Sequence, residues 1–213
     1  MAELNDIAQA VIAGDAALVS TLVEAALAEG EAASAVLEHG LTAGMAVIGR
    51  RFRANEIFVP EVLIAARAMK AGLSQLEPIL SAAGVAPVGT FVIGTVRGDI
   101  HDIGKNLVGM MLRGAGFSVV DLGVNVMPQA FVDAAKQHGA QLVGLSALLT
   151  TTMVQMRPTI EALRAASPDV KVLVGGAPVS PEFAASIGAD GYGANATDAV
   201  ERALELVGRA ASS

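Results

Sequence analysis

The densest group of polar side chains in the sequence lies between residues 95 and 106, TVRGDIHDIGKN. Within it, Asp99 stands two residues before His101. This spacing lets the carboxylate fold back onto one imidazole nitrogen, which fixes the tautomer and leaves the other nitrogen to bind a metal. A helix-capping pair is the alternative, because Asp or His before a helix often only satisfies backbone amides. Gly98 and Gly104 keep side chains away on either side.

The residues around this group predict a strand, a loop and a helix. An apolar run rich in β-branched residues precedes the group at 89–96, and helical spacing follows it at 102–113. His101 is therefore predicted on a strand-to-helix loop. In parallel α/β sheets, ligands bind at such loops, outside the carboxyl ends of the strands.

After Val88 the chain alternates between strand and helix patterns. The predicted strands are 90–96, 117–122, 142–146, 170–174 and 189–192, and helices are predicted to begin near residues 102, 128, 152, 181 and 197. Such alternation predicts an α/β domain with a five-stranded, doubly wound parallel sheet. In the flavodoxin-like strand order, the loop after the third strand would lie beside the His101 loop.

The N-terminal part of the sequence has helical patterns and lacks strand signals. Two helices are predicted around a break at Gly14, a third from Glu31 to about Arg50, and a fourth from Pro60 to about Leu80. The sequence therefore predicts a four-helix bundle at 1–85, a linker at 81–87 rich in small residues, and an α/β domain at 88–213.

Composition excludes several classes of partner. The net charge is −7 with 14 basic residues and 3% aromatic residues, so neither a phosphate-binding stripe nor a base-stacking surface is expected. Cysteine is absent, which fits a reducing compartment. No apolar run approaches the roughly 20 residues of a membrane span. The sequence predicts a cytoplasmic protein with no nucleic-acid partner and no membrane partner.

The string GDIHDIGKN resembles the cobalamin-binding signature Asp-x-His-x-x-Gly, matched here by Asp99, His101 and Gly104. In that family the histidine replaces the cofactor's own nucleotide base as the lower ligand of cobalt. The resemblance therefore implies that His101 binds the metal, with Asp99 acting through it. It also implies that the rest of the loop contacts the cofactor, including Gly98, Ile100 and Asp102.

The resemblance extends to three further loops of the predicted α/β domain. Taken singly, a Ser/Thr run before a helix or a Gly-Gly pair after a strand is most often a cap or a turn. Together they match the slot that holds the cofactor's displaced nucleotide tail, at Ser146, Leu148, Thr150, Gly175, Gly176, Asn195 and Ala196. Thr152 falls where methionine synthase carries a serine that completes a His-Asp-Ser chain.

The segment 44–69 resembles the cap bundle of methionine synthase and of small corrinoid proteins. The resemblance implies that Phe52 and Val59 cover the upper face of the corrin and that Glu38 contacts the cofactor. Phe58 is predicted to be an ordinary core residue of the bundle. His138 is predicted to interact with a helix end, and His39 is left unassigned.

The resemblance implies the function of a corrinoid protein in a multi-component methyltransferase system. Such a protein binds cobalamin base-off and shuttles a methyl group. A substrate-specific methyltransferase methylates Co(I), the methylcobalamin form travels with the corrinoid protein, and a second methyltransferase accepts the methyl group. A reductive activase is a further partner in such systems.

Other classes of function fit the sequence less well. A cobalamin-dependent sensor or regulatory module is the main alternative, but it would need a DNA-binding domain that we do not expect here. A phosphorylated receiver domain requires an aspartate at the end of the third strand, where this chain has Ser146. A flavin or nicotinamide enzyme would carry a G-x-G-x-x-G turn after the first strand. A hydrolytic metal site would need a second histidine at useful spacing.

Overall fold

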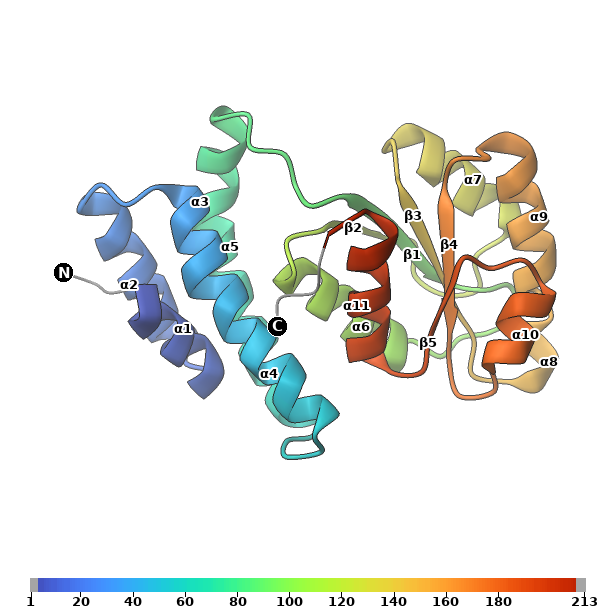
Figure 1. The fold of residues 1–213 in the computed structure, drawn as a ribbon, viewed down its shortest axis with the longest axis horizontal. Helices are drawn as coiled ribbons and strands as arrows, with labels where there is room; N and C mark the ends of the chain where they lie inside the picture. Colours follow the sequence, from blue (N-terminus) through green and yellow to red (C-terminus); the bar gives the residue numbers. More distant parts are fainter. Residues whose placement is uncertain (1–3, 210–213) are drawn as a thin grey trace. The chain divides into compact units, whose positions relative to one another are not determined.

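The computed structural model describes residues 4–209, apart from the side chain of Ser81. The chain divides into two compact units (Figure 1). One contains the described residues up to Pro87 together with Gly114–Gly116. The other contains Val88–Arg113 and the described residues from Phe117 onward.

The first unit is a bundle of four helical stretches within its described residues. They are α1 (Leu4–Ala13), α2 (Ala16–Ala28), a long third stretch made of α3 (Ala33–Ala35), η1 (Val36–Thr42) and α4 (Ala43–Arg53), and α5 (Val59–Ala82). The predicted break between α1 and α2 is present, since Gly14 has a φ of +73°. The Asp15 side chain caps α2 by accepting a hydrogen bond from the Leu18 amide at 2.9 Å.

The third helical stretch differs from its prediction in one respect. It spans residues 33–53, close to the predicted 31–50, but its segment η1 has π-helical hydrogen bonding. Gly40 on η1 and Gly44 at the start of α4 face α1, and a Cβ at Gly44 would lie 2.8 Å from the carbonyl oxygen of Ala8. These two glycines therefore allow the third stretch and α1 to approach closely.

The core of the bundle is aliphatic. Its fully buried side chains include Ile7, Val11, Val19, Leu41 and Leu76. The prediction that Phe58 is a core residue was wrong, because this side chain is 66% exposed. Phe58 lies just before α5, where the chain turns between two helices, so its apolar character carried no information about burial.

The second unit contains the predicted parallel sheet. Its strands are β1 (Thr90–Thr95), β2 (Ser118–Asp121), β3 (Leu142–Ser146), β4 (Lys171–Gly175) and β5 (Gly191–Gly193). Its helices are α6 (Ile103–Gly114), α7 (Pro128–Gln137), α8 (Thr150–Met153), α9 (Met156–Ala166), α10 (Pro181–Ser186) and α11 (Ala196–Leu206). The strand order is β2-β1-β3-β4-β5 and all pairs are parallel, which confirms the flavodoxin-like prediction.

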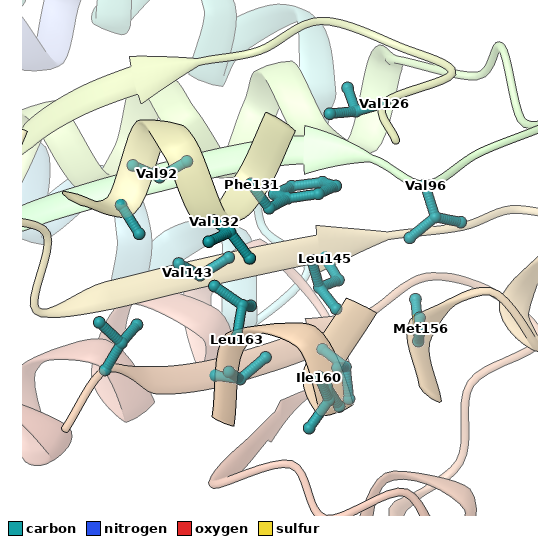
Figure 2. Close-up of a cluster of buried hydrophobic side chains, with 14 of the residues drawn as sticks. Val92, Val96, Val126, Phe131, Val132, Val143, Leu145, Met156, Ile160 and Leu163 are labelled. Carbon is teal, nitrogen blue, oxygen red and sulfur yellow. The ribbon is translucent and has the colours of Figure 1, made fainter. Parts of the chain in front are cut away.

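One face of the sheet packs against α7, α9 and α10. Val92 and Val143 from the strands meet Phe131 of α7 and Leu163 of α9 in a cluster of buried side chains (Figure 2). Gly94 on β1 makes room for this packing, since a Cβ there would lie 2.8 Å from the Phe131 ring. Burial of these large apolar side chains is the dominant stabilising contribution to the unit.

Strands β1 and β3 are central neighbours, and their register fixes the ends of both. Thr95 of β1 pairs with Ser146 of β3. The Val96 amide donates to the Ser146 carbonyl at 3.0 Å. The loop that carries His101 therefore begins beside the loop that follows β3.

Candidate functional site

The centre of the site is the carboxylate of Asp99, which is completely buried. Its Oδ1 accepts from the His101 amide at 3.0 Å and lies 2.7 Å from Nδ1 of the His101 ring. Its Oδ2 accepts from the Leu148 amide at 2.8 Å and from the Thr152 hydroxyl at 2.6 Å. The predicted loop after β3 thus reaches the carboxylate through a backbone amide and a hydroxyl.

These hydrogen bonds keep Asp99 ionised. Burial alone would raise the pKa of its carboxyl. The Thr152 hydroxyl, the amides of Leu148 and His101, and the imidazole together outweigh burial and hold the pKa well below its usual range. A buried carboxylate that remains charged is a strong hydrogen-bond acceptor.

The ionised carboxylate decides the tautomer of His101. Because Asp99 can only accept, Nδ1 of the neutral imidazole carries the proton and Nε2 carries the lone pair. The His101 side chain is 46% exposed. The residue therefore presents a basic nitrogen from a partly open position, as a metal-ligating histidine does.

The helix-capping alternative for Asp99 and His101 is not what the structure contains. Helix α6 begins at Ile103, whereas the Asp99 oxygens accept from residues of the loops after β1 and β3. The capping alternative for Thr152 fails in the same way. The N-cap of α8 is Leu149. The Thr152 hydroxyl donates to Asp99 Oδ2 at 2.6 Å and also lies 3.0 Å from the Leu149 carbonyl oxygen.

Two residues that sequence reasoning did not single out hold the His101 loop. The hydroxyl of Thr95, at the end of β1, donates to the His101 carbonyl at 2.8 Å. The side-chain oxygen Oδ1 of Asn125, in the loop after β2, accepts from the Gly98 backbone amide at 2.7 Å. The backbone amide of Asn125 donates to the Asp99 carbonyl at 2.9 Å. Asn125 and Gly98 both have positive φ, at +54° and +80°.

A partly buried ion pair links the start of α6 to the end of β2 beside the same loop. Lys105 is 3% exposed, and its ammonium lies 2.5 Å from Asp121 Oδ2 at the end of β2. The ammonium also donates to Asn106 Oδ1 at 2.6 Å, and Asn106 in turn donates to Asp102 at 3.0 Å. The Asp102 side chain is thus engaged in positioning α6.

The glycines predicted after β4 are required by close backbone approach. A Cβ at Gly176 would lie 1.9 Å from the Ala147 carbonyl oxygen, and Gly176 has a φ of +126°. A Cβ at Gly175 would lie 2.9 Å from the Gly193 carbonyl oxygen. The packing of three neighbouring loops therefore explains why Gly175 and Gly176 are glycines. Without side chains at these two positions, the loop backbone is not covered by them.

The other predicted residues of this unit lie on the same edge of the sheet with different environments. Ser146 is half-buried, Leu148 and Thr150 are exposed, and Ala196 is buried at the start of α11. Asn195 caps α11 by accepting from the Asp198 amide at 3.0 Å. This cap explains the residue type at position 195 without a ligand.

The rim around His101 is apolar and exposed. Ile100 and Ile103 are about three-quarters exposed, at 74% and 75%, and Leu148 and Leu149 are each 44% exposed. A Cβ at Gly104 would meet nothing within 4 Å, so open space lies next to the start of α6. A basic nitrogen on a loop that also exposes aliphatic side chains suits a metal held in a large, mostly apolar macrocycle.

The predicted residues of the bundle belong to the first unit. Glu38 is exposed on the π-helical segment η1, and Phe52 and Val59 are half-buried at the end of α4 and the start of α5. His39 is exposed on η1, and His138 is the exposed C-cap residue of α7. The π-helical turn at Glu38 is notable because such turns occur frequently at functional sites.

None of the helices in the described part of the chain is long and apolar enough to cross a membrane. Within residues 4–209, no group of three or more His, Asp or Glu side chains could hold a metal ion.

The fold and the site define a cofactor-binding α/β protein with a histidine at the carboxyl edge of its sheet. Residues 89–201 match the B12 binding domain family, and residues 3–77 match a second family of the same description. The chain belongs to the B12-binding corrinoid proteins. It binds cobalamin, and the basic nitrogen, apolar rim and open space around His101 fit that cofactor.

Relatives match along nearly the whole chain. A corrinoid protein of Desulfitobacterium hafniense (strain Y51) is 42% identical, with 98% of this chain and 99% of the relative covered. The dimethylamine corrinoid protein of Methanosarcina barkeri is 43% identical, with 96% and 97% covered. The solved methanol:cobalamin methyltransferase complex of the same organism contains a chain with a TM-score of 0.85 and 30% identity, with 96% of this chain and 79% of that chain covered.

Proposed function

We propose that this protein is the methyl carrier of a multi-component methyltransferase system, holding cobalamin base-off with His101 as the lower ligand of cobalt. The observation that supports this most strongly is the chain from Thr152 through Asp99 to His101, which leaves Nε2 with its lone pair at an apolar, open edge. When bound, the cobalt of the corrinoid carries the methyl group.

The protein's own residues supply the basicity and the orientation of the ligand. Asp99 attracts the proton on Nδ1, which raises electron density at Nε2 and makes it a better donor. Thr152 and the Leu148 amide fix the opposite oxygen of the carboxylate, so the ring direction is set by two loops. Asp99 acts through His101 and is a positioning residue.

The loops after β3, β4 and β5 are proposed to hold the nucleotide tail of the cofactor. Backbone exposed at Gly175 and Gly176 permits close contact, and the hydroxyls of Ser146 and Thr150 offer uncharged hydrogen bonds. Leu148, Asn195 and Ala196 are proposed contacts on the same edge. The cap that Asn195 makes to α11 holds this residue in place on that edge.

The bundle is proposed to cover the upper face of the corrin. Phe52 and Val59 would shield the reactive face, and Glu38 would contact the cofactor from η1. Both partner enzymes must reach that face, so we propose that residues 81–87 act as a hinge between closed and open states. Helix α5 ends at Ala82 and β1 begins at Thr90, so most of this segment lacks regular structure.

The proposed partners are a substrate-specific methyltransferase, a second methyltransferase that accepts the methyl group, and a reductive activase. The relatives described above are named for dimethylamine and for methanol. We therefore propose a small methylated compound of this kind as the donor, and the cytoplasm as the compartment. A cobalamin-dependent sensor is not favoured, since the relatives belong to methyltransferase systems.

Substitution of the ligand tests the proposed role of His101. The protein is loaded with cobalamin and reduced to the Co(II) state, and electron paramagnetic resonance reports whether a protein nitrogen couples to cobalt. We expect nitrogen coupling in the parent and its loss in His101→Ala. His138→Ala, which changes an exposed helix-end histidine, is the matched control and should keep the coupling. Coupling retained in His101→Ala would refute the ligand assignment.

Methyl transfer separates a carrier from a sensor. The loaded parent is first reduced chemically to the Co(I) state and mixed with a candidate donor methyltransferase and its methylated substrate. The methyl group on the protein is then measured, followed by its release to an acceptor methyltransferase. A carrier turns over repeatedly with both partners. Stable loading without turnover with any partner would favour the sensor.

A further inference from the structure

The main chain of His101 is held on both sides by side chains from the same segment. On one side, the His101 amide donates to Asp99 Oδ1 at 3.0 Å. On the other, the His101 carbonyl accepts from the hydroxyl of Thr95 at 2.8 Å. The first contact belongs to the motif around Asp99. The second comes from the last residue of β1 and lies outside that motif.

Thr95 is itself fixed more firmly than the loop that it contacts. It is completely buried, and its register on β1 is set by pairing with β3. Its amide donates to the Gly123 carbonyl at 3.0 Å, and its carbonyl accepts from the Val126 amide at 2.9 Å. The hydroxyl is therefore presented from a rigid point between two strands and the loop after β2.

The residue type at this position needs an explanation. The preceding residues of β1 are apolar or glycine, from Phe91 to Gly94, and a valine would suit a fully buried strand end as well as threonine does. A buried hydroxyl is costly unless it forms a hydrogen bond. The hydrogen bond that satisfies it is the one to the His101 carbonyl.

We propose that Thr95 is a positioning residue for His101. Its hydroxyl restricts rotation of the His101 main chain, while Asp99 restricts the ring, and together they hold Nε2 in one direction. This inference rests on the proposed role of His101 as the ligand. It adds Thr95 to Asp99 and His101, the pair that the motif contains. Because Thr95 is the last residue of β1, the orientation of His101 then depends in part on the sheet.

Thr95→Val tests the proposal, because valine has nearly the same shape and lacks the hydroxyl. Thr159→Val is the matched control. Thr159 is also buried, at 1% exposure, and its hydroxyl donates to the Gln155 carbonyl at 2.8 Å within α9. The control therefore removes a similar hydrogen bond of the same length at a position with no contact to the His101 loop. Thr95→Ser restores the hydroxyl and is the rescue variant.

Amide hydrogen exchange in the cofactor-free protein is the first measurement. We expect the His101 amide to exchange about 5-fold faster in Thr95→Val than in the parent, the order of effect that one lost hydrogen bond produces. Thr95→Ser and Thr159→Val should exchange like the parent at this amide. A purely structural role would instead accelerate amides in the core strands, such as those of Val92 and Val143, to the same extent.

Electron paramagnetic resonance of the loaded Co(II) protein is the second measurement. The fraction of molecules with nitrogen coupling should fall in Thr95→Val and return in Thr95→Ser. If the parent shows no coupling, the proposed ligation by His101 fails, and hydrogen exchange still tests Thr95. Parent-like exchange at His101 in Thr95→Val would overturn the proposal. If valine prevents folding, Thr95→Ser and Thr95→Ala make the same comparison without a branched side chain, and equal exchange in these two variants would overturn it.

Discussion

Asp99 combines two properties that usually exclude each other, because it is fully buried and it stays ionised. Four hydrogen-bond donors around its two oxygens offset the cost of burial. The charge is needed because a protonated carboxyl would no longer accept the Nδ1 proton of His101. The residue therefore links the stability of the loop to the basicity of the ligand.

This arrangement predicts a pH dependence of stability in the cofactor-free protein. The pKa of Asp99 in the folded state lies below its unfolded value of about 3.9. As the pH falls from about 5, the unfolded chain binds a proton before the folded chain does, so the contribution of Asp99 to stability is progressively lost. Above about pH 5 this contribution is fully present.

We expect Asp99→Asn to be less stable than the parent at pH 7 and to lose less stability between pH 5 and pH 3. Urea denaturation across this range measures both effects. Asp133→Asn, on the exposed face of α7, is the matched control and should follow the parent curve. An identical pH slope for Asp99→Asn and the parent would show that Asp99 does not titrate as described.

At the residue scale, the sequence contained the Asp99–His101 contact, and the family resemblance added Thr152 from the loop after β3, but the contribution of the loop after β2 was missed. Asp99 and His101 are two residues apart, so their contact follows from chain geometry. The contact of Asn125 with Gly98 depends on the path of a separate loop, and nothing in the local sequence fixes that path. Phe58 shows the opposite failure, since an aromatic residue in a helical region was taken as core and is exposed.

At the scale of elements, a charge pair ties the first turn of α6 to the end of β2. Lys105 is almost fully buried, and its charge is balanced by Asp121 at the end of β2. Because Asp121 is a third exposed, the pair is only partly desolvated. The ion pair connects α6 to β2 and thereby limits movement of the His101 loop that lies between β1 and α6.

Removal of one partner should leave the Lys105 ammonium without an anion. We expect Asp121→Asn to lower the free energy of unfolding by about 1–3 kcal/mol, as for loss of a hydrogen bond to a charged group. Glu205→Gln is the matched control, since Glu205 pairs with Arg202 on the exposed surface of α11 and such pairs contribute less than about 1 kcal/mol. Urea denaturation at pH 7 measures both variants. Equal losses would mean that burial of Lys105 does not matter.

The strands were predicted within one or two residues, because short apolar runs that alternate with helical patterns are a local signal. The interior of the third helical stretch was not, because a short π-helical segment within an α-helix displaces the amphipathic pattern only slightly. The close approach of Gly44 to the Ala8 carbonyl is a tertiary contact that no local pattern encodes. The predicted single helix after β3 is interrupted at Val154–Gln155 for a comparable reason, since Thr152 on α8 is held by Asp99.

At the scale of the whole molecule, the two units match two separate B12 binding domain families. Each unit has its own buried core. Units of this kind can change their relative arrangement without unfolding, since changes of φ and ψ at a few residues of a connecting segment are enough. A carrier that must shield its cargo and then expose it requires this property.

The proposed cover by the bundle leads to the last prediction. If Phe52 shields the upper face of the corrin, Phe52→Ala should make the methylcobalamin form of the protein photolyse faster than the parent. Without the ring, the methyl radical released by light can escape from the cofactor more easily, and water can reach the exposed face. Phe52 is half-buried, so its truncation should cost less than the roughly 3–5 kcal/mol typical of a fully buried phenylalanine. Folding and cofactor content are checked first by circular dichroism and cobalt analysis.

Phe58→Ala is the matched control, since it removes the same ring from a position that is 66% exposed, and it should photolyse like the parent. Methyl transfer by Phe52→Ala should persist, because His101 and the loops after β3 and β4 are unchanged. Equal photolysis rates in the parent and in both variants would mean that the bundle does not cover the corrin through Phe52, and the first unit would then need a different role.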